Sequence, residues 1–194
     1  MEGPDRCSSP ALPQPAPGLR VRNPACLFTP ASCYARFREA LSDGSEYVRE
    51  DLGMPETIRF HGLELRFLHS KDDTDGSVDV FEMTVQPNAR MPVPHHHDRW
   101  DETVYGLTGV TTWRVDGQDT QVGPGQSVFI KRGIVHGFRN DTQEPARCLC
   151  ILSPGVLGPA YFRDMLELLS GGAPDLAKMK ETMLRYGLVP APPA

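Results

Sequence analysis

The sequence predicts a mainly β protein, in which one sandwich or barrel of short strands is followed by helices. From Thr57 onward apolar and polar residues alternate, as in Phe81-Glu-Met-Thr-Val85, and this is the pattern of half-buried strands. Turn signals such as Asp116-Gly117 and Gly123-Pro-Gly125 separate these runs at the roughly 8–12-residue spacing of sandwiches and barrels. After Pro154-Gly155 the period becomes helical.

The segment before the strands predicts a tail and a short helix. Residues 1–20 are rich in Pro, Ser and Ala, and such a composition buries too little apolar surface to offset the entropy of ordering. Thr29-Pro30 is typical of a helix start, with Thr as the cap and Pro at the first helical position. Because Tyr34, Phe37 and Leu41 follow at helical spacing, we expect an amphipathic helix that ends near Leu41.

The strand region begins with one face that carries Leu63, Leu65, Phe67 and His69. We expect His69 to be a hydrogen-bonded core histidine, with a role in a pocket as the alternative. Residues 102–107 and 110–115 predict a hairpin, joined by a tight turn at Thr108-Gly109. Later short strands are predicted at 127–130, 135–139 and 146–152.

Two C-terminal helices complete the predicted chain. Tyr161 and Met165 recur at helical spacing in the first helix, and Met179 and Met183 lie on one stripe of the second. These stripes are typical of core contacts. The predicted organisation is therefore a flexible tail at 1–20, a helical and loop arm at 21–56, a β-barrel at 57–155, and C-terminal helices with a short tail at 156–194.

Composition narrows the function classes. The length of 194 residues suits one domain with extensions. A net charge of -5 without a basic run argues against a nucleic-acid partner. No apolar run approaches the roughly 18 residues of a membrane span, and the first residues do not read as a secretory signal. Five cysteines, an odd number, favour reduced thiols, so we expect a cytoplasmic protein.

The residues that predict chemistry lie between Pro94 and Asn140. Strand alternation places His95 and His97 on one face and His96 on the other. Glu102 follows His97 after four intervening residues, and His136 lies in a later predicted strand. Three imidazoles and one carboxylate, brought together inside a barrel, form a four-ligand site for a divalent metal.

This stretch resembles the cupins, which are small jelly-roll β-barrels. The first cupin motif combines an H-x-H pair, a glutamate and a glycine, matched here by His95, His97, Glu102 and Gly109. The second combines two glycines, a histidine and an asparagine, matched by Gly125, Gly133, His136 and Asn140. Ala89 and Lys131 stand where the motifs usually have glycine and proline, at turns away from the ligands.

The resemblance implies a cupin jelly-roll β-barrel with an N-terminal helix, two C-terminal helices and a single cupin domain of the quercetin-dioxygenase-like group. It implies a metal-dependent dioxygenase for a small aromatic or diketone-like molecule, with Glu102 as both metal ligand and proton acceptor. Ligands of nitrogen and oxygen without thiolate leave Fe, Mn, Ni, Co, Cu and Zn as candidates, and of these we expect iron first. Cupins commonly pair, so we expect a homodimer with residues 20–60 in the interface.

An apolar pocket is expected over the metal. Phe138 shares a strand face with His136, and Met83 and Trp113 line the same cavity if their faces point inward, with ordinary core packing as the alternative for Trp113. Arg99 and Trp100, between the ligands, form either the pocket rim or an exposed loop.

Two further alternatives concern the loop acids and the reaction. Asp98 and Asp101 are either solvated or hydrogen-bonded to a ligand histidine. Cupins also include isomerases, lyases and non-catalytic proteins. The alternative functions are therefore a redox-neutral isomerase or lyase, in which Glu102 moves a proton, and a non-catalytic module that binds a small ligand.

Overall fold

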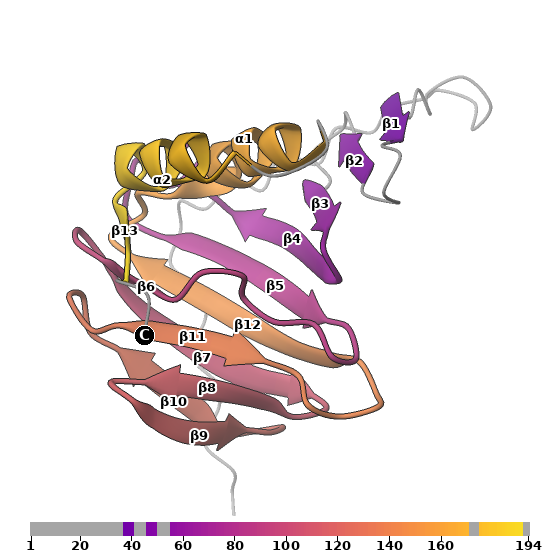
Figure 1. Cartoon of the computed structure of the whole chain (residues 1–194), viewed down its shortest axis with the longest axis vertical. Coiled ribbons are helices and arrows are strands. Elements are labelled where there is room, and N and C mark those ends of the chain that lie inside the picture. Colours follow the sequence, from indigo (N-terminus) through magenta and orange to yellow (C-terminus); the bar gives the residue numbers. More distant parts are fainter. Residues whose placement is uncertain (1–36, 41–45, 50–54, 171–174, 192–194) are drawn as a thin grey trace, which may run out of the picture. The chain divides into compact units, whose positions relative to one another are not determined.

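The computed structural model describes residues 37–40, 46–49, 55–170 and 175–191 (Figure 1), with the backbone alone for the first two ranges. The chain divides into two units, Met1–Tyr34 and Ala35–Ala194, and all described residues belong to the second. The expected tail at 1–20 therefore lies outside the described residues, and the predicted segment limits stay predictions.

The described chain is mainly β, with two sheets and two helices. The eight-stranded sheet has the order β1-β2-β3-β4-β5-β12-β7-β10, and the five-stranded sheet has the order β13-β6-β11-β8-β9. Neither sheet closes on itself within the described residues, so the strand pairing gives two open sheets instead of the expected closed barrel. The strands are β1 (Phe37–Ala40), β2 (Glu46–Arg49), β3 (Thr57–Phe60), β4 (Leu63–His69), β5 (Asp79–Val85), β6 (His95–His97), β7 (Asp101–Thr108), β8 (Thr111–Val115), β9 (Gln118–Val122), β10 (Ser127–Ile130), β11 (His136–Arg139), β12 (Ala146–Ser153) and β13 (Leu188–Pro190).

One predicted hairpin is wrong, because the chain changes sheets at Gly109. β7 pairs with β10 and β12, whereas β8 pairs with β9 and β11. Gly109 has φ +65°, and a Cβ there would lie 2.8 Å from the Cα atom of Ala146. The turn signal was correct, but it marks a corner between the sheets. The predicted turn at 123–125 likewise joins strands of different sheets.

The Asp116-Gly117 turn does join a hairpin, as predicted. Both residues have positive φ, 50° and 76°, and two-residue turns of this kind match the twist of antiparallel strands. β8 and β9 pair along five residues, from Thr111 opposite Val122 to Val115 opposite Gln118.

The predicted N-terminal helix is wrong in its last turn. Residues 37–40 form β1, which pairs antiparallel with β2, with Phe37 opposite Arg49. Helical spacing over so few residues does not separate a helix from a strand, and pairing with a neighbouring strand decides the outcome. Residues 29–36, where the helix was expected to begin, lie outside the described residues.

The predicted alternation on β4 and β5 is confirmed except at its end. Leu65, Phe67 and Met83 are buried, and they pack in the core between the sheets. His69, expected in the core, is exposed over 63% of its side chain, and its Nδ1 lies 3.2 Å from Asp73 Oδ2. The reason is a register shift between Phe67 and His69, which takes the histidine off the inward face.

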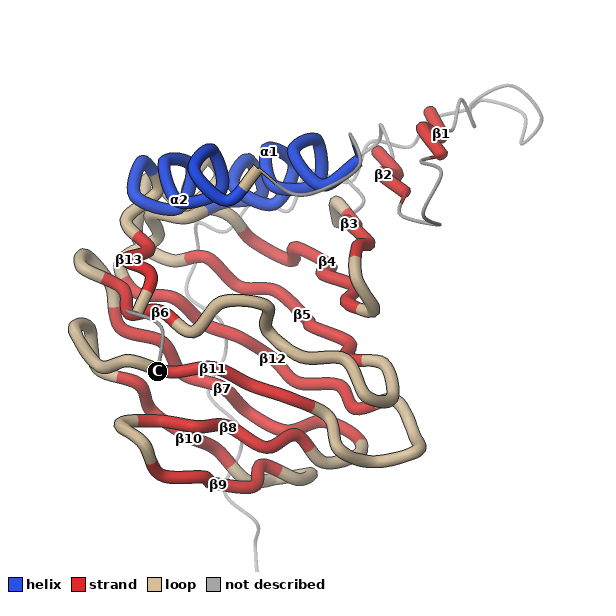
Figure 2. Tube along the Cα trace, in the orientation of Figure 1, coloured by secondary structure: helices blue, strands red, loops and turns tan. Residues whose placement is uncertain are grey.

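Both helices follow β12 and lie on the same side of the strands (Figure 2). α1 spans Gly158–Ser170, and α2 spans Leu176–Arg185. Asp79, fully buried at the start of β5, accepts hydrogen bonds at Oδ2 from the backbone N–H groups of Leu157 and Gly158. This carboxylate fixes the start of α1 on the sheet. Within the described residues, neither helix has the length and apolarity to cross a membrane.

Candidate metal centre and pocket

The two short strands β6 and β11 carry the histidines. His95 lies opposite His136 in the antiparallel pair, and the other edge of β6 pairs with β13. His95, His97 and His136 are buried, whereas His96 is partly exposed. The alternation predicted for the histidine run is therefore what the strand shows.

The three buried histidines converge between the sheets, and the Glu102 carboxylate lies beside two of them. The Nε2 atoms of His95 and His97 are 3.2 Å apart. Glu102 Oε2 lies 3.5 Å from His136 Nε2 and 3.9 Å from His97 Nε2. One ligand atom from each histidine lies within 4.8 Å of the others. Glu102 comes from β7 of the other sheet and is 6% exposed.

In His95 and His136, a hydrogen bond made by Nδ1 leaves Nε2 as the ring nitrogen that can accept a bond within the cluster. Nδ1 of His95 lies 3.1 Å from the carbonyl oxygen of Val93, and Nδ1 of His136 lies 3.0 Å from that of Ile134. A carbonyl only accepts, so each Nδ1 carries the hydrogen and each Nε2 keeps a lone pair. This arrangement orients metal-binding histidines in general.

The donor set fits a divalent metal ion. Nε2 of His136 is buried without a hydrogen-bond partner, although buried polar atoms almost always have one. Its 3.5 Å separation from Glu102 Oε2 is longer than a normal hydrogen bond. A metal taking three imidazole nitrogens and one carboxylate oxygen would satisfy that atom.

Electrostatics keep His95 and His97 in the form that binds metals. Burial, with a contribution from His136, lowers the pKa of His95 to about 3. Burial and the neighbouring histidines likewise lower the pKa of His97. For His136 burial lowers the pKa, but the Glu102 carboxylate outweighs it and the net pKa is raised. At neutral pH, His95 and His97 are thus neutral imidazoles.

Trp100 packs against the histidine cluster, and this contact was not predicted from the sequence. Its side chain is fully buried and stacks on His97, with 4.4 Å between ring centroids. It is therefore neither a pocket rim nor an exposed loop residue, the two alternatives considered for it. Its Nε1 has no hydrogen-bond partner. The sequence feature that could have predicted this contact is the position of an aromatic residue between two proposed ligands, His97 and Glu102.

The acids in the ligand loop bind arginines. Asp101 accepts hydrogen bonds from the backbone N–H (2.8 Å) and Nη2 (2.9 Å) of Arg132. These bonds hold the pKa of Asp101 at about 2. Arg132 Nη1 also donates to the carbonyl of Arg99. Asp98 pairs with Arg99. The two acids thus bind arginines of this region, and the arginine contacts tie together the loop between the ligands.

An apolar pocket adjoins the cluster. Its walls include Met83, Trp113 and Phe138, the three residues predicted to line it, together with His95, His97 and Glu102. The pocket is partly open to solvent, and concave walls that are mostly apolar with a few polar groups are typical of small-molecule sites. Trp113 packs on Phe138 with 5.0 Å between centroids and donates from Nε1 to Thr111 Oγ1.

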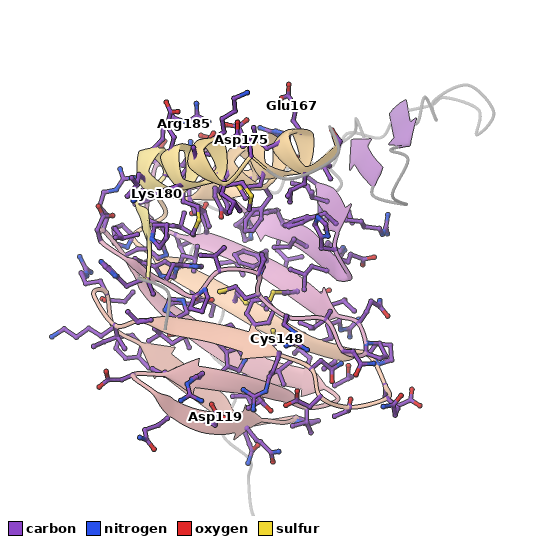
Figure 3. All side chains as sticks on the ribbon, in the orientation of Figure 1. Asp119, Cys148, Glu167, Asp175, Lys180 and Arg185 are labelled. Atoms are coloured by element: carbon purple, nitrogen blue, oxygen red, sulfur yellow. The ribbon has the colours of Figure 1, made fainter. Side chains whose placement is uncertain are left out.

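The helices contribute to this pocket as well as to the core. Tyr161, Met165 and Met183 are buried, as core packing predicted, and they also line the cavity. The charged residues Glu167 and Arg185 lie on the side of the helices that faces away from the sheets (Figure 3). The sequence predicted that these faces of the two helices are buried, but it did not predict that they line the pocket.

Two buried thiols lie beside the site. Cys148 and Cys150 are free, and their Sγ atoms are 4.0 Å apart. Cys150 lines the pocket. The contact with Cys148 and burial raise the pKa of the Cys150 thiol, so this group is a neutral part of the wall.

Comparison with known proteins gives one relative with substantial identity. Quercetin 2,3-dioxygenase from Bacillus subtilis is 31% identical over 143 residues, which cover 72% of this chain and 41% of that protein. The chain thus spans about two fifths of the length of this curated relative.

Solved structures show weaker likeness. A predicted oxalate decarboxylase from Thermotoga maritima is 22% identical, with 52% of this chain and 92% of that chain covered and a TM-score of 0.47. A polyketide cyclase from Streptomyces resistomycificus is 28% identical, with 53% and 70% covered and a TM-score of 0.44.

The part of the chain that matches a known protein family includes the residues of the candidate metal centre. Residues 81–152 match the family described as "Cupin domain", and this range contains the histidines and glutamate of the cluster as well as the corner glycine Gly109. The dioxygenase relative agrees with it. Residues 81–152 of this chain are therefore a cupin domain.

Proposed function

We propose that this protein binds a divalent transition metal, with iron as the first candidate, and is a dioxygenase for a small aromatic or diketone-like molecule. The ligands are His95, His97, Glu102 and His136. The observation that carries the proposal is the convergence of these side chains, with an unpartnered nitrogen on His136, beside an apolar pocket.

Three nitrogens and one oxygen leave open positions on a six-coordinate metal. When bound, the metal would polarise a substrate oxygen and supply the site at which dioxygen reacts. The 31% identity to quercetin 2,3-dioxygenase supports oxygen-dependent chemistry over the isomerase or lyase alternative.

The chain's own side chains supply position and proton transfer. Trp113 and Phe138, together with Met83, hold a flat ring and exclude water from the reacting atoms. Glu102 Oε2 lies at the cluster and in the pocket wall. It is placed to accept the proton of a substrate hydroxyl as the substrate binds.

The test begins with metal analysis of protein purified without added metal, followed by an oxygen-electrode assay with flavonols and 1,3-diketones. We expect substrate-dependent oxygen uptake that a chelator removes and one divalent metal restores. His97→Ala is the control for adventitious metal. Substrate turnover without oxygen uptake would instead support a redox-neutral isomerase or lyase, and binding without turnover would support a non-catalytic module.

We also propose a homodimer. β1, which lies within the predicted interface segment 20–60, is an edge strand of the eight-stranded sheet, and exposed edges are commonly covered by a second chain. Light scattering at micromolar concentration tests this, and a monomer mass would contradict it. The cytoplasmic location stays a prediction.

A further inference from the structure

Helix α1 places one unused hydrogen-bond donor in the pocket wall. Tyr161 lines the pocket and is 8% exposed, yet its hydroxyl makes no hydrogen bond to any described residue. Buried tyrosines usually have a partner for this group. Burial raises the pKa of Tyr161 above its ordinary value, so the phenol keeps its proton throughout the physiological range.

The other polar groups of the wall are already engaged or belong to the metal cluster. The indole N–H of Trp113 donates to Thr111, and the thiol of Cys150 contacts that of Cys148. His95, His97 and Glu102 belong to the cluster. Among the described lining residues, Tyr161 carries the one hydroxyl group, and that hydroxyl has no protein partner.

The rest of the wall favours an aromatic ligand. Every methionine among the described residues lines this pocket, namely Met83, Met91, Met165, Met179 and Met183. Methionine side chains are polarizable, adapt their shape and pack well on aromatic rings. Phe162, beside Tyr161, lies 5.8 Å from Phe67 and 5.9 Å from Phe81 between ring centroids.

We infer that Tyr161 is a substrate-positioning residue whose hydroxyl donates a hydrogen bond to an oxygen atom of an otherwise apolar aromatic substrate. This inference rests on the proposed function in one respect, because it takes the metal cluster as the place where the other end of the substrate reacts. The pocket then selects aromatic molecules with oxygen at both ends. One end of the substrate contacts the metal cluster, and the other end contacts Tyr161 on α1.

The experiment compares two flavonols that share the metal-binding 3-hydroxy-4-ketone group. Quercetin carries further hydroxyls on its rings, whereas 3-hydroxyflavone carries none. Binding to zinc-loaded protein, in which the metal has no redox chemistry, is measured by absorbance titration. Tyr161→Phe should weaken quercetin binding by about 3- to 10-fold, the effect of one lost hydrogen bond. Binding of 3-hydroxyflavone should change by less than about twofold.

Tyr186→Phe is the matched control. Its hydroxyl donates to Asp164 Oδ2 at 2.8 Å, and Tyr186 is not among the residues that line the pocket. We expect this variant to bind both flavonols as the wild type does. Near-ultraviolet circular dichroism confirms that both variants keep their tertiary packing.

The comparison of the two flavonols distinguishes a lost hydrogen bond from a general loss of packing. Equal losses for both flavonols would show that Tyr161 acts through packing alone, and unchanged quercetin binding would show that it binds no substrate oxygen. Failure of the wild type to bind either flavonol would also overturn the inference. A missing oxygen uptake by the iron-loaded protein, with the selective loss retained, would reject the dioxygenase proposal and leave the role of Tyr161 intact.

Discussion

The indole ring of Trp100 lies nearly parallel to the imidazole ring of His97, with 4.4 Å between the ring centroids and 21° between the ring planes. This stacking restricts the rotation of one proposed metal ligand. Since Trp100 is fully buried, its removal affects both the stability of the protein and the geometry of the cluster.

Trp100→Ala should lower the free energy of unfolding by about 3–5 kcal/mol, because it removes a large buried side chain and leaves a cavity. It should also weaken zinc binding by roughly 10- to 100-fold, the usual cost of losing a residue that orients a ligand. Urea unfolding and a competition titration measure these effects. Trp100→Phe is the control, and zinc binding at wild-type strength by folded Trp100→Ala would contradict the role in orientation.

The neighbouring histidines give a paired test of the cluster. His97→Ala should abolish most metal binding, because its ring nitrogen is one of the converging atoms. His96→Ala should leave binding largely intact, because its side chain is on the opposite face of β6. Metal content after dialysis measures both variants. Equal losses would show that the register of the strand is different.

Glu102→Gln preserves the shape of the side chain and removes its charge. At equal metal occupancy it should slow turnover by roughly 10²–10⁴-fold, the effect of a lost general base. The measurement is oxygen uptake with a substrate that the wild type consumes. Turnover at the wild-type rate would mean that Glu102 is only a ligand.

Acid should destabilise the metal-free protein through His95. Its pKa is about 3 in the folded chain against an ordinary value of 6.5. Below pH 6.5 the unfolded chain binds a proton that the folded chain does not, so the free energy of unfolding falls as pH falls. The slope is at most about 1.4 kcal/mol per pH unit from this group. The lowered pKa of His97 acts in the same direction, and the raised pKa of His136 opposes it.

Urea unfolding of chelator-treated protein between about pH 7 and pH 5 checks this slope. His95→Gln should flatten it, and His96→Gln should have a much smaller effect, because His96 contributes least to the lowered pKa of His95. Parallel curves for wild type and His95→Gln would contradict the assignment.

The placement of the proposed ligands on their strands could be predicted because it follows from short-range rules. Strand alternation placed His95 and His97 together, and placed Phe138 on the face of His136. Burial of Met83 and Trp113 followed from the same period. The burial of these residues depends only on the local strand geometry and on a second sheet that packs against the strand.

The errors concern long-range choices. A turn signal at Gly109 states that the chain bends, but not which sheet receives the next strand. The register shift before His69 depends on pairing with β5. Burial of Trp100, and the place of Tyr161 in the pocket wall, depend on elements far away in the sequence. Local propensity carries no information on such contacts.

The pairing of β13 with β6 affects the order of assembly. Leu188 lies opposite His97 and Pro190 opposite His95, across a separation of about ninety residues that must first be closed. One edge of the ligand strand therefore gains its backbone partners only when the segment after α2 docks. Until that docking β6 is paired with β11 alone, so the strand that carries His95 and His97 is held on both edges only late in folding.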